Sequence, residues 1–350
     1  MNKHHTTNTW LSVYLFYNEP WEEFLQKAIE PYVNTAIQTG IAQQYFFIRY
    51  WENGPHIRLR LKGEMDMVNT ILKPNLEEHF TNYFESMPSR RIEPQYPANF
   101  SEDLKWYPNN SIKYEDYESE VGRYGGDVGI LLAEEQFMVS SKTVLDFIKQ
   151  KGRSWSYDDA MGVSIKLHLT FIHSAGLDIQ EAIDFYDFFA KNWLPYTFKK
   201  SQGEINNDDF QHQSNLSIQA FEDSFSTQKE ILIPFHSVLW NALEEGDSFE
   251  EDILNLWVQK NKDITNQVKS AFENNNLTDR KTKYKYKIPP KNPQKNGLVW
   301  SIFADYIHLT NNRLGILNKD ESYLSFMMMR CLQEIKKNKN SSVATEIPIE

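Results

Sequence analysis

Two short strand-like runs separated by a tight turn constrain the fold of this chain more than any other feature. Residues 45–51 read YFFIRYW and residues 56–62 read HIRLRLK. The four residues between them contain Asn53-Gly54, a dipeptide that favours a tight hairpin because both residues tolerate a positive φ. The sequence therefore predicts an antiparallel β-hairpin over residues 45–62.

The segments around this hairpin predict a sheet with packed helices. Residues 10–17 (WLSVYLFY) form a third strand-like run. Apolar residues recur at helical spacing from Trp21 to Gly40, where a glycine commonly ends a helix, and again over residues 65–84 despite Pro74. This β-α-β-β-α order predicts a mixed, largely antiparallel sheet with helices packed against it.

From residue 127 onward the apolar spacing is almost wholly helical. Helices are predicted over residues 128–139, 142–151, 158–173, 179–193, 208–227, 230–244, 249–274, 299–310 and 320–336. The predicted fold class is α+β, with a sheet-rich part at 10–126 and a helix-rich part at 127–336 in one domain of residues 1–350. Residues 337–350 are polar and are expected to be a disordered tail.

The composition of the chain indicates its cellular compartment and the kinds of partner it can bind. Cys331 is the only cysteine among 350 residues, so we expect no internal disulfide and a cytoplasmic protein. The first nine residues carry no apolar signal region, and every apolar run is far shorter than the roughly 20 residues that cross a bilayer. A net charge of −11 argues against direct nucleic-acid binding, because such binding depends on neutralising phosphates.

A cationic face is predicted on the second strand of the hairpin. His56, Arg58 and Arg60 alternate with apolar residues, so their side chains share one face of the sheet. Such a face can simply lie in solvent. It can also bind an anionic substrate, because arginine grips carboxylates with two parallel hydrogen bonds.

A second candidate motif is E-V-G-R-Y-G-G at residues 120–126, directly before a predicted helix. It contains Glu120, Arg123 and Tyr124, and its last two glycines permit a tight turn with close backbone approach. A surface Glu-Arg pair before a helix would look the same. Spacing alone does not decide between the two interpretations.

A third candidate motif is H-L-T-N-N-R-L-G at residues 308–315. His308 and Asn312 lie one helical turn apart on the same face if the helix continues, and Arg313 follows. A single helical histidine is more often structural than catalytic. Its ordinary pKa near neutrality nevertheless suits it to proton transfer if it faces a cleft.

The sequence lacks the motifs of several familiar chemistries. It contains no phosphate-binding P-loop, no dinucleotide fingerprint, no H-E-x-x-H and no cysteine cluster, so we expect no cofactor and no metal. Cys331 lies in an apolar helical stretch and is interpreted as core packing. Residues 280–295 (RKTKYKYKIPPKNPQK) are interpreted as a solvated surface hairpin or loop, and contact with a partner is left open.

Taken together, the three motifs at residues 45–60, 120–126 and 308–315 resemble the C-terminal elimination domain of class I lantibiotic dehydratases, the thiopeptide-type bacteriocin biosynthesis domain. They occur in family order and span nearly the whole chain. The resemblance implies a stand-alone subunit that eliminates glutamate from glutamylated Ser or Thr of a precursor peptide, leaving dehydroalanine or dehydrobutyrine. A separate glutamyl-tRNA-dependent protein would carry out the glutamylation, and a cyclase is a further candidate partner.

The resemblance also implies roles for individual residues. His308 matches the elimination histidine and is expected to act as acid or base, while Arg60 and Arg123 match positions expected to clamp the glutamyl group or the enolate. Glu120 matches a functional glutamate of unassigned role. Supporting substrate-binding positions are Arg58, His56, Arg313, Asn312 and Tyr124.

Two rival functions remain open. A thiopeptide pyridine synthase uses the same scaffold to join two dehydroalanines in a formal [4+2] cycloaddition, but such relatives need not keep the glutamate and histidine found here as Glu120 and His308. A non-catalytic subunit that binds the precursor peptide along a sheet edge is the second rival.

Overall fold

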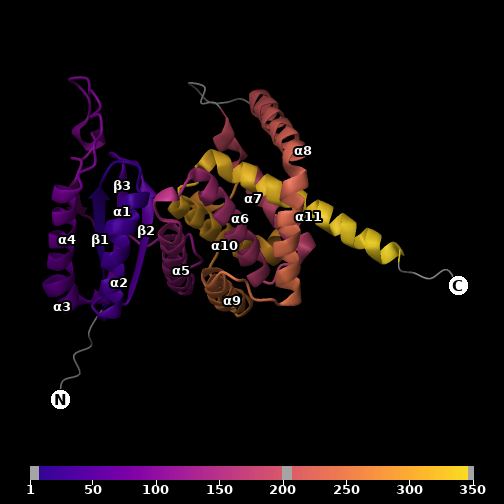
Figure 1. Cartoon of the computed structure of the whole chain (residues 1–350), viewed down its shortest axis with the longest axis horizontal. Helices are drawn as coiled ribbons and strands as arrows, with labels where there is room; N and C mark the ends of the chain where they lie inside the picture. Colours follow the sequence, from indigo (N-terminus) through magenta and orange to yellow (C-terminus); the bar gives the residue numbers. More distant parts are fainter. Residues whose placement is uncertain (1–7, 199–206, 346–350) are drawn as a thin grey trace, which may run out of the picture. The chain divides into compact units, whose positions relative to one another are not determined.

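The computed structural model describes residues 8–198 and 207–345 (Figure 1). The chain divides into two compact units. The first unit comprises Met1–Glu120 and Ala133–Ser156, and the second unit comprises Val121–Leu132 and Tyr157–Glu350.

The first unit contains a four-stranded antiparallel sheet. Its strands are β1 (Asn8–Phe16), β2 (Gln44–Tyr50), β3 (His56–Glu64) and β4 (Ser111–Tyr114), in the order β2-β3-β1-β4. The predicted hairpin is confirmed, since β2 pairs antiparallel with β3, and both Asn53 (φ 58°) and Gly54 (φ 103°) have positive φ. β4 was not predicted; it is only four residues long and pairs with β1.

The first unit also contains the α-helices that precede residue 87. They are α1 (Glu22–Phe24), α2 (Glu30–Gln38), α3 (Met65–Met67) and α4 (Lys73–Ser86), joined by the π turns η1 (Leu25–Ile29) and η2 (Val68–Leu72). The apolar side chains of β1 and β3 that alternate with the cationic ones, including Val13, Leu15 and Leu59, are fully buried. Because these apolar side chains face the core, the cationic side chains that alternate with them lie on the opposite face of the sheet.

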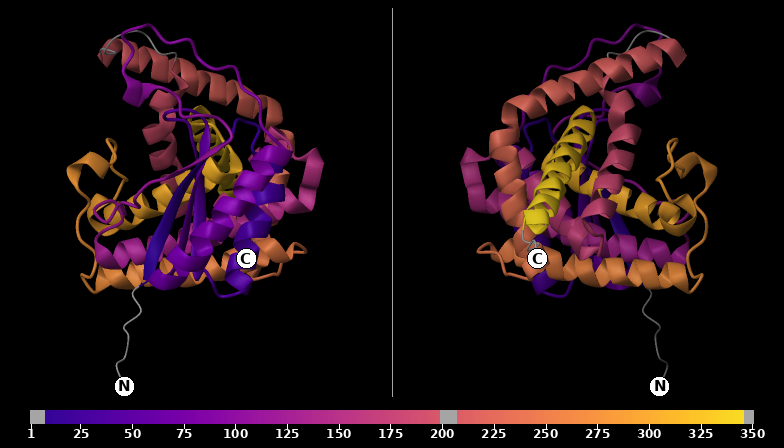
Figure 2. Two further views of the ribbon diagram at one scale, coloured as in Figure 1. Left: turned by 90° about the vertical axis from the view of Figure 1, so that its left-hand side faces the viewer. Right: turned by 90° about the vertical axis from the view of Figure 1, so that its right-hand side faces the viewer.

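The second unit is helical. Its long helices are α6 (Tyr157–Ser174), α7 (Ile179–Trp193), α8 (Asn207–Glu245), α9 (Asp252–Glu273), α10 (Pro293–Leu314) and α11 (Asn318–Thr345). Figure 1 shows the elongated α11, and both views of Figure 2 show α8 along its length. Short 3-10 turns are η3 (Glu102–Leu104) and η4 (Gly152–Ser154) in the first unit and η5 (Leu194–Thr197) and η6 (Thr282–Tyr284) in the second. The four strands precede these helices along the chain, which confirms the α+β class.

Several helices are longer than predicted. α5 (Asp127–Lys151), which begins in the second unit and continues in the first, is one helix where two were expected, and so is α8 despite Pro234 in its interior. α11 runs to Thr345, beyond the predicted helical end at residue 336, and residues 346–350 lie outside the described residues. The added stretch contains neither glycine nor proline, so nothing local ends the helix.

The helix that carries the third motif has a defined end. α10 stops at Gly315, whose left-handed φ of 87° allows its N–H to bond to the Asn312 carbonyl. His308 and Asn312 therefore share one continuous helix, as predicted. Cys331 is fully buried in α11, and burial raises the pKa of its thiol to about 12, so its interpretation as core packing is confirmed.

Candidate functional site

The cationic face of β3 is covered rather than solvated. His56 is 1% exposed and Arg60 6% exposed, while Arg58 is half-buried. Their cross-strand partners on β1 are Phe16, Tyr14 and Ser12, so aromatic rings surround the cations. The prediction that all three side chains share one face is confirmed.

Arg60 is a buried cation that lacks a carboxylate partner within the described residues. Its guanidinium lies 5.2 Å from the Tyr14 ring and 5.8 Å from the Tyr117 ring, and its Nε and Nη1 make no hydrogen bond there. Burial lowers the pKa of Arg60 to about 10, which leaves the side chain charged at neutral pH. A buried cation without a carboxylate partner costs folding free energy, which the neighbouring aromatic rings offset only in part.

His56 is held as a neutral imidazole. Burial lowers its pKa to about 4, its Nδ1 lies 2.8 Å from the Gly54 carbonyl oxygen, and Arg58 Nε donates to its Nε2 at 3.1 Å. A neutral ring that donates through Nδ1 and accepts through Nε2 satisfies both contacts. His56 therefore orients Arg58, whose guanidinium also lies 3.4 Å from the centre of the Tyr50 ring.

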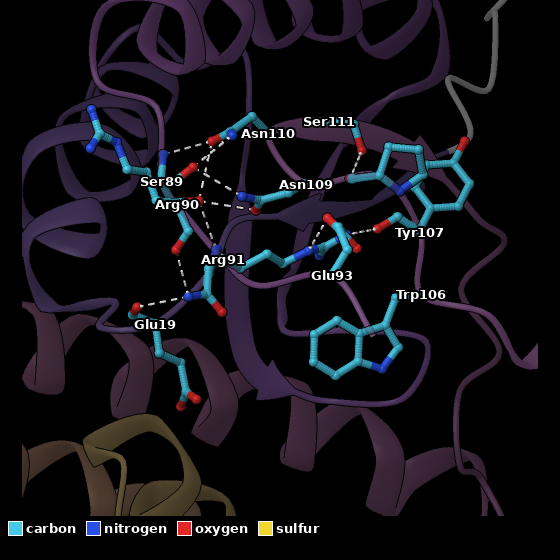
Figure 3. Close-up of polar contacts among 12 residues, drawn as sticks. Glu19, Ser89, Arg90, Arg91, Glu93, Trp106, Tyr107, Asn109, Asn110 and Ser111 are labelled. Atoms are coloured by element: carbon cyan, nitrogen blue, oxygen red, sulfur yellow. Dashed lines mark hydrogen bonds and ion pairs between the residues drawn. The ribbon is translucent and has the colours of Figure 1, made fainter. Parts of the chain in front are cut away.

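A cavity of about 170 Å³ lies beside Arg58. Its lining residues are Tyr14, Phe16, Glu52, Asn53, His56, Arg58, Glu102, Asp103, Lys105, Tyr107 and Lys113. The segment after α4 forms one wall of this cavity, and Figure 3 shows the contacts that hold it. Ser89 and Asn110 exchange hydrogen bonds of 2.8 and 2.9 Å, while Arg91 donates to Glu93 and to the Tyr107 carbonyl.

The R-Y-G-G loop (residues 121–126) lies in the second unit and is as tightly turned as predicted. Gly125 (φ 85°) and Gly126 (φ 97°) both have positive φ, which favours glycine. The next glycine, Gly129, packs so closely that a Cβ there would lie 1.7 Å from the Tyr124 carbonyl oxygen. The backbone that carries Arg123 is therefore closely fixed to the start of α5.

Arg123 is anchored by a buried carboxylate on α10. Its Nε and Nη2 donate to the two oxygens of Asp305 at 2.9 and 2.8 Å, and Asp305 is 1% exposed. Arg280 Nη2 and the Tyr286 hydroxyl donate to the same carboxylate at 2.6 and 2.8 Å. Burial raises the pKa of Asp305, but the two arginines and Tyr286 lower it by more, so this carboxyl stays ionised.

His308 pairs with a buried glutamate that the sequence did not suggest. Its Nδ1 lies 2.8 Å from Glu321 Oε1, and Asn311 Nδ2 donates to Glu321 Oε2 at 3.0 Å. Asn311 is itself held by His168 and Ser164, whose atoms lie 2.8 Å from its Oδ1. A fully buried chain of polar groups therefore fixes the orientation of the imidazole.

The electrostatics around His308 favour its protonated form. Burial lowers its pKa, but the Glu321 carboxylate raises it by more, so the pKa lies above its ordinary value. The side chain of His308 is 21% exposed, and within the described residues its Nε2 has no hydrogen-bond partner. One nitrogen is thus fixed by Glu321, and the other is available for proton transfer.

The remaining predicted site residues divide between the units. Glu120 is half-buried at the end of the first unit's N-terminal portion, whereas Tyr124, Asn312 and Arg313 belong to the second unit. Tyr124 is 1% exposed, and Arg313 is fully buried with its pKa lowered to about 9 by burial. Their substrate-binding roles stay predictions.

The structure brings together four residues that sequence reasoning missed. Asp305, Glu321, Arg280 and Tyr286 contact Arg123 or His308 directly or through one side chain. Asp305 precedes His308 by three residues, so its position on the same helix face was the one available signal. The other three come from separate segments, and only the folded chain reveals them.

Two kinds of feature are absent from the described ranges 8–198 and 207–345. No helix there is long and apolar enough to span a membrane. Within the same ranges, His, Cys, Asp and Glu side chains form no group of three or more that could hold a metal ion.

Solved structures of similar fold share little sequence with this chain. The pyridine synthase TbtD from thiomuracin biosynthesis has a TM-score of 0.72 at 14% identity, covering 94% of this chain and 99% of its own. TsrL has a TM-score of 0.64 at 16% identity, covering 98% of this chain and 100% of its own. The tRNA-dependent lantibiotic dehydratase MibB from Microbispora sp. 107891 has a TM-score of 0.56 at 14% identity, with 97% of this chain matching 29% of MibB.

The similarity to these solved structures establishes the fold alone. A match to a family model identifies the family from the sequence itself. No curated protein matches the chain in sequence. The model of the lantibiotic biosynthesis dehydratase C-terminal family matches residues 10–332, nearly the full length of the chain. The chain therefore belongs to the family of lantibiotic biosynthesis dehydratase C-terminal domains.

Proposed function

We propose that this chain eliminates glutamate from glutamylated Ser or Thr residues of a ribosomally made precursor peptide, forming dehydroalanine or dehydrobutyrine. A separate tRNA-dependent protein would supply the glutamylated peptide. The family and the structural neighbours concern the modification of such peptides, which agrees with this assignment. The observation that carries the proposal is the His308 imidazole, whose Nδ1 lies 2.8 Å from Glu321 Oε1 and whose side chain is 21% exposed.

The proposed reaction needs a base and groups that stabilise negative charge. His308 Nε2 takes the proton from Cα, the Cα–H electron pair forms the C=C bond, and the Cβ–O bond breaks to release glutamate with its carboxylate. The new imidazolium is stabilised by the buried Glu321 carboxylate. The released proton thus stays on His308 until solvent removes it.

Arginines are proposed to stabilise the developing charge. Arg123 is fixed by Asp305, and Arg60 is a buried cation without a carboxylate partner in the described part of the chain, so each is suited to an anionic group of the substrate. One well-placed donor of this kind lowers the barrier by on the order of 3 kcal/mol. Glu120 is proposed to take part as well, in orienting an arginine or moving a proton.

Replacing Arg123 tests this assignment in a system reconstituted with the glutamylation partner. Arg123→Ala should slow elimination by roughly 100-fold, because a donor to the transition state is lost, and glutamylated peptide should accumulate in the mass spectrum. The matched control is Arg153→Ala, which removes an exposed arginine of η4 and should leave elimination unchanged. Accumulation of clean, unmodified peptide in the Arg123 variant would count against the assignment.

A pyridine synthase is the second candidate. TbtD supports it, because that pyridine synthase matches this chain over 99% of its own length, whereas MibB matches over 29%. The substrate separates the two functions. A peptide with two dehydroalanines and no glutamyl ester should remain linear if the chain is an eliminase, and it should be converted to a cyclic product if the chain is a pyridine synthase.

A further inference from the structure

The side chains of the basic segment 280–287 face in two directions. Arg280 and Tyr286 turn inward to the Asp305 carboxylate. Four lysines of the segment are exposed: Lys281, Lys283, Lys285 and Lys287. No carboxylate pairs with any of these four lysines within the described residues. The chain carries 48 acidic residues against 37 basic ones, so four neighbouring lysines without a carboxylate partner are unusual here.

This segment is attached to the R-Y-G-G loop by its backbone. The Thr278 N–H donates to the Gly125 carbonyl at 2.8 Å, and the Lys281 N–H donates to the Gly122 carbonyl at 3.1 Å. The stem of Lys281 lies directly over Gly122, where a Cβ would come within 2.8 Å of it. A lysine therefore crosses the backbone next to Arg123, and the other three follow within a few residues.

We propose that Lys281, Lys283, Lys285 and Lys287 form a docking surface for an acidic stretch of the precursor peptide. The choice of a peptide as the partner rests on the proposed function, in which a precursor peptide is the substrate. Carboxylates of an acidic peptide would neutralise the unpaired ammonium groups and keep the reacting Ser or Thr near the loop that carries Arg123. A short basic segment on a chain of net charge −11 suits a peptide better than a long polyphosphate backbone.

Binding of a defined probe tests this surface without depending on catalysis. The probe is a fluorescein-labelled peptide of alternating Glu and Ser, titrated with the full chain at low salt and followed by anisotropy. Replacing all four lysines by glutamine should weaken binding by about ten-fold or more, and added salt should weaken wild-type binding toward the same level. The matched control replaces four other exposed lysines of the second unit, Lys229, Lys260, Lys262 and Lys319, by glutamine and should bind within about two-fold of wild type.

Two outcomes would overturn the proposal. One is equal binding by the two quadruple variants, because the effect would then follow net charge rather than this surface. The other is tighter binding of a single-stranded RNA of similar length, lost in the same variant, which would assign the surface to nucleic acid. Elimination from a short glutamyl-ester peptide without acidic residues should be unchanged in the docking variant, so failure of the catalytic proposal is seen separately as no turnover by the wild-type chain.

Discussion

Arg49 and Arg60 are both buried arginines of the same sheet, and they differ in their partners. Arg49 is 4% exposed and donates to Glu22 at 2.8 Å, whereas Arg60 is 6% exposed and has no carboxylate partner in the described part of the chain. A buried ion pair offsets part of its desolvation cost, but a lone buried cation does not. We therefore assign Arg49 a structural role and Arg60 a functional one.

This contrast predicts opposite effects on stability. Arg60→Met should leave the free energy of unfolding in urea unchanged or raise it by about 1 kcal/mol, because an uncompensated charge is removed, while elimination falls roughly 100-fold. The control Arg49→Met should instead lose about 1 kcal/mol, because Glu22 loses its partner. A strongly destabilised Arg60→Met variant would mean that Arg60 stabilises the fold.

The His308–Glu321 pair predicts a pH dependence. His308 must be neutral to act as a base, and the Glu321 carboxylate raises its pKa against the lowering effect of burial and of Arg123, with Asp305 adding to the rise. Glu321→Gln keeps the hydrogen-bond acceptor but removes the charge. The pKa of His308 should fall, so the acidic limb of the pH profile of kcat should move to lower pH.

An NMR titration of the His308 ring provides a second readout that does not depend on turnover. The matched control is Asp320→Asn, which removes a carboxylate one residue away that bonds to Tyr157 instead. That variant should leave the pKa of the His308 ring unchanged. An unchanged or upward shift in Glu321→Gln would contradict the proposed pairing.

At the scale of elements, two helical glycines predict opposite outcomes. A Cβ at Gly129, in the first turn of α5, would lie 1.7 Å from the Tyr124 carbonyl oxygen, whereas a Cβ at Gly162 in α6 would meet no atom within 4 Å. Gly129→Ala should lose about 2 kcal/mol or more of unfolding free energy and displace the R-Y-G-G loop. Gly162→Ala should gain up to about 1 kcal/mol, because alanine favours a helix more than glycine does.

Urea unfolding of both variants, together with their elimination rates, checks this prediction. Elimination should fall in Gly129→Ala because Arg123 moves with its loop, and it should be unchanged in Gly162→Ala. Equal stability of the two variants would show that the close packing at Gly129 does not hold the loop.

Local patterns predicted the elements better than they predicted the contacts of the site. The hairpin and most helices follow from turn chemistry and apolar spacing, which act within a few residues. β4 was not predicted because its four residues are fixed by pairing with β1 rather than by their own propensity. α8 was predicted as two helices, 208–227 and 230–244, but it continues through residues 228 and 229 and packs against α6 and α11.

The same limit applies to the candidate site. Arg60, Arg123 and His308 lie in recognisable motifs, but Asp305 and Glu321 are defined by what they touch. Arg280 is separated by 157 residues from Arg123, and the Asp305 carboxylate joins them. Such contacts depend on tertiary structure, so no local pattern contains them.

For the whole molecule, the family match covers residues 10–332, nearly the full length of the chain. We propose that this chain acts on the glutamyl ester by itself, without tRNA, on a peptide glutamylated by another protein.

The most direct test is mass spectrometry of a synthetic peptide with one glutamyl-ester Ser, incubated with this protein alone. We predict loss of glutamate to give dehydroalanine, with the reaction abolished in His308→Ala while the peptide still binds. An ester that stays intact while bound to the wild-type protein would contradict elimination by this chain and favour a cyclase or a non-catalytic peptide-binding subunit.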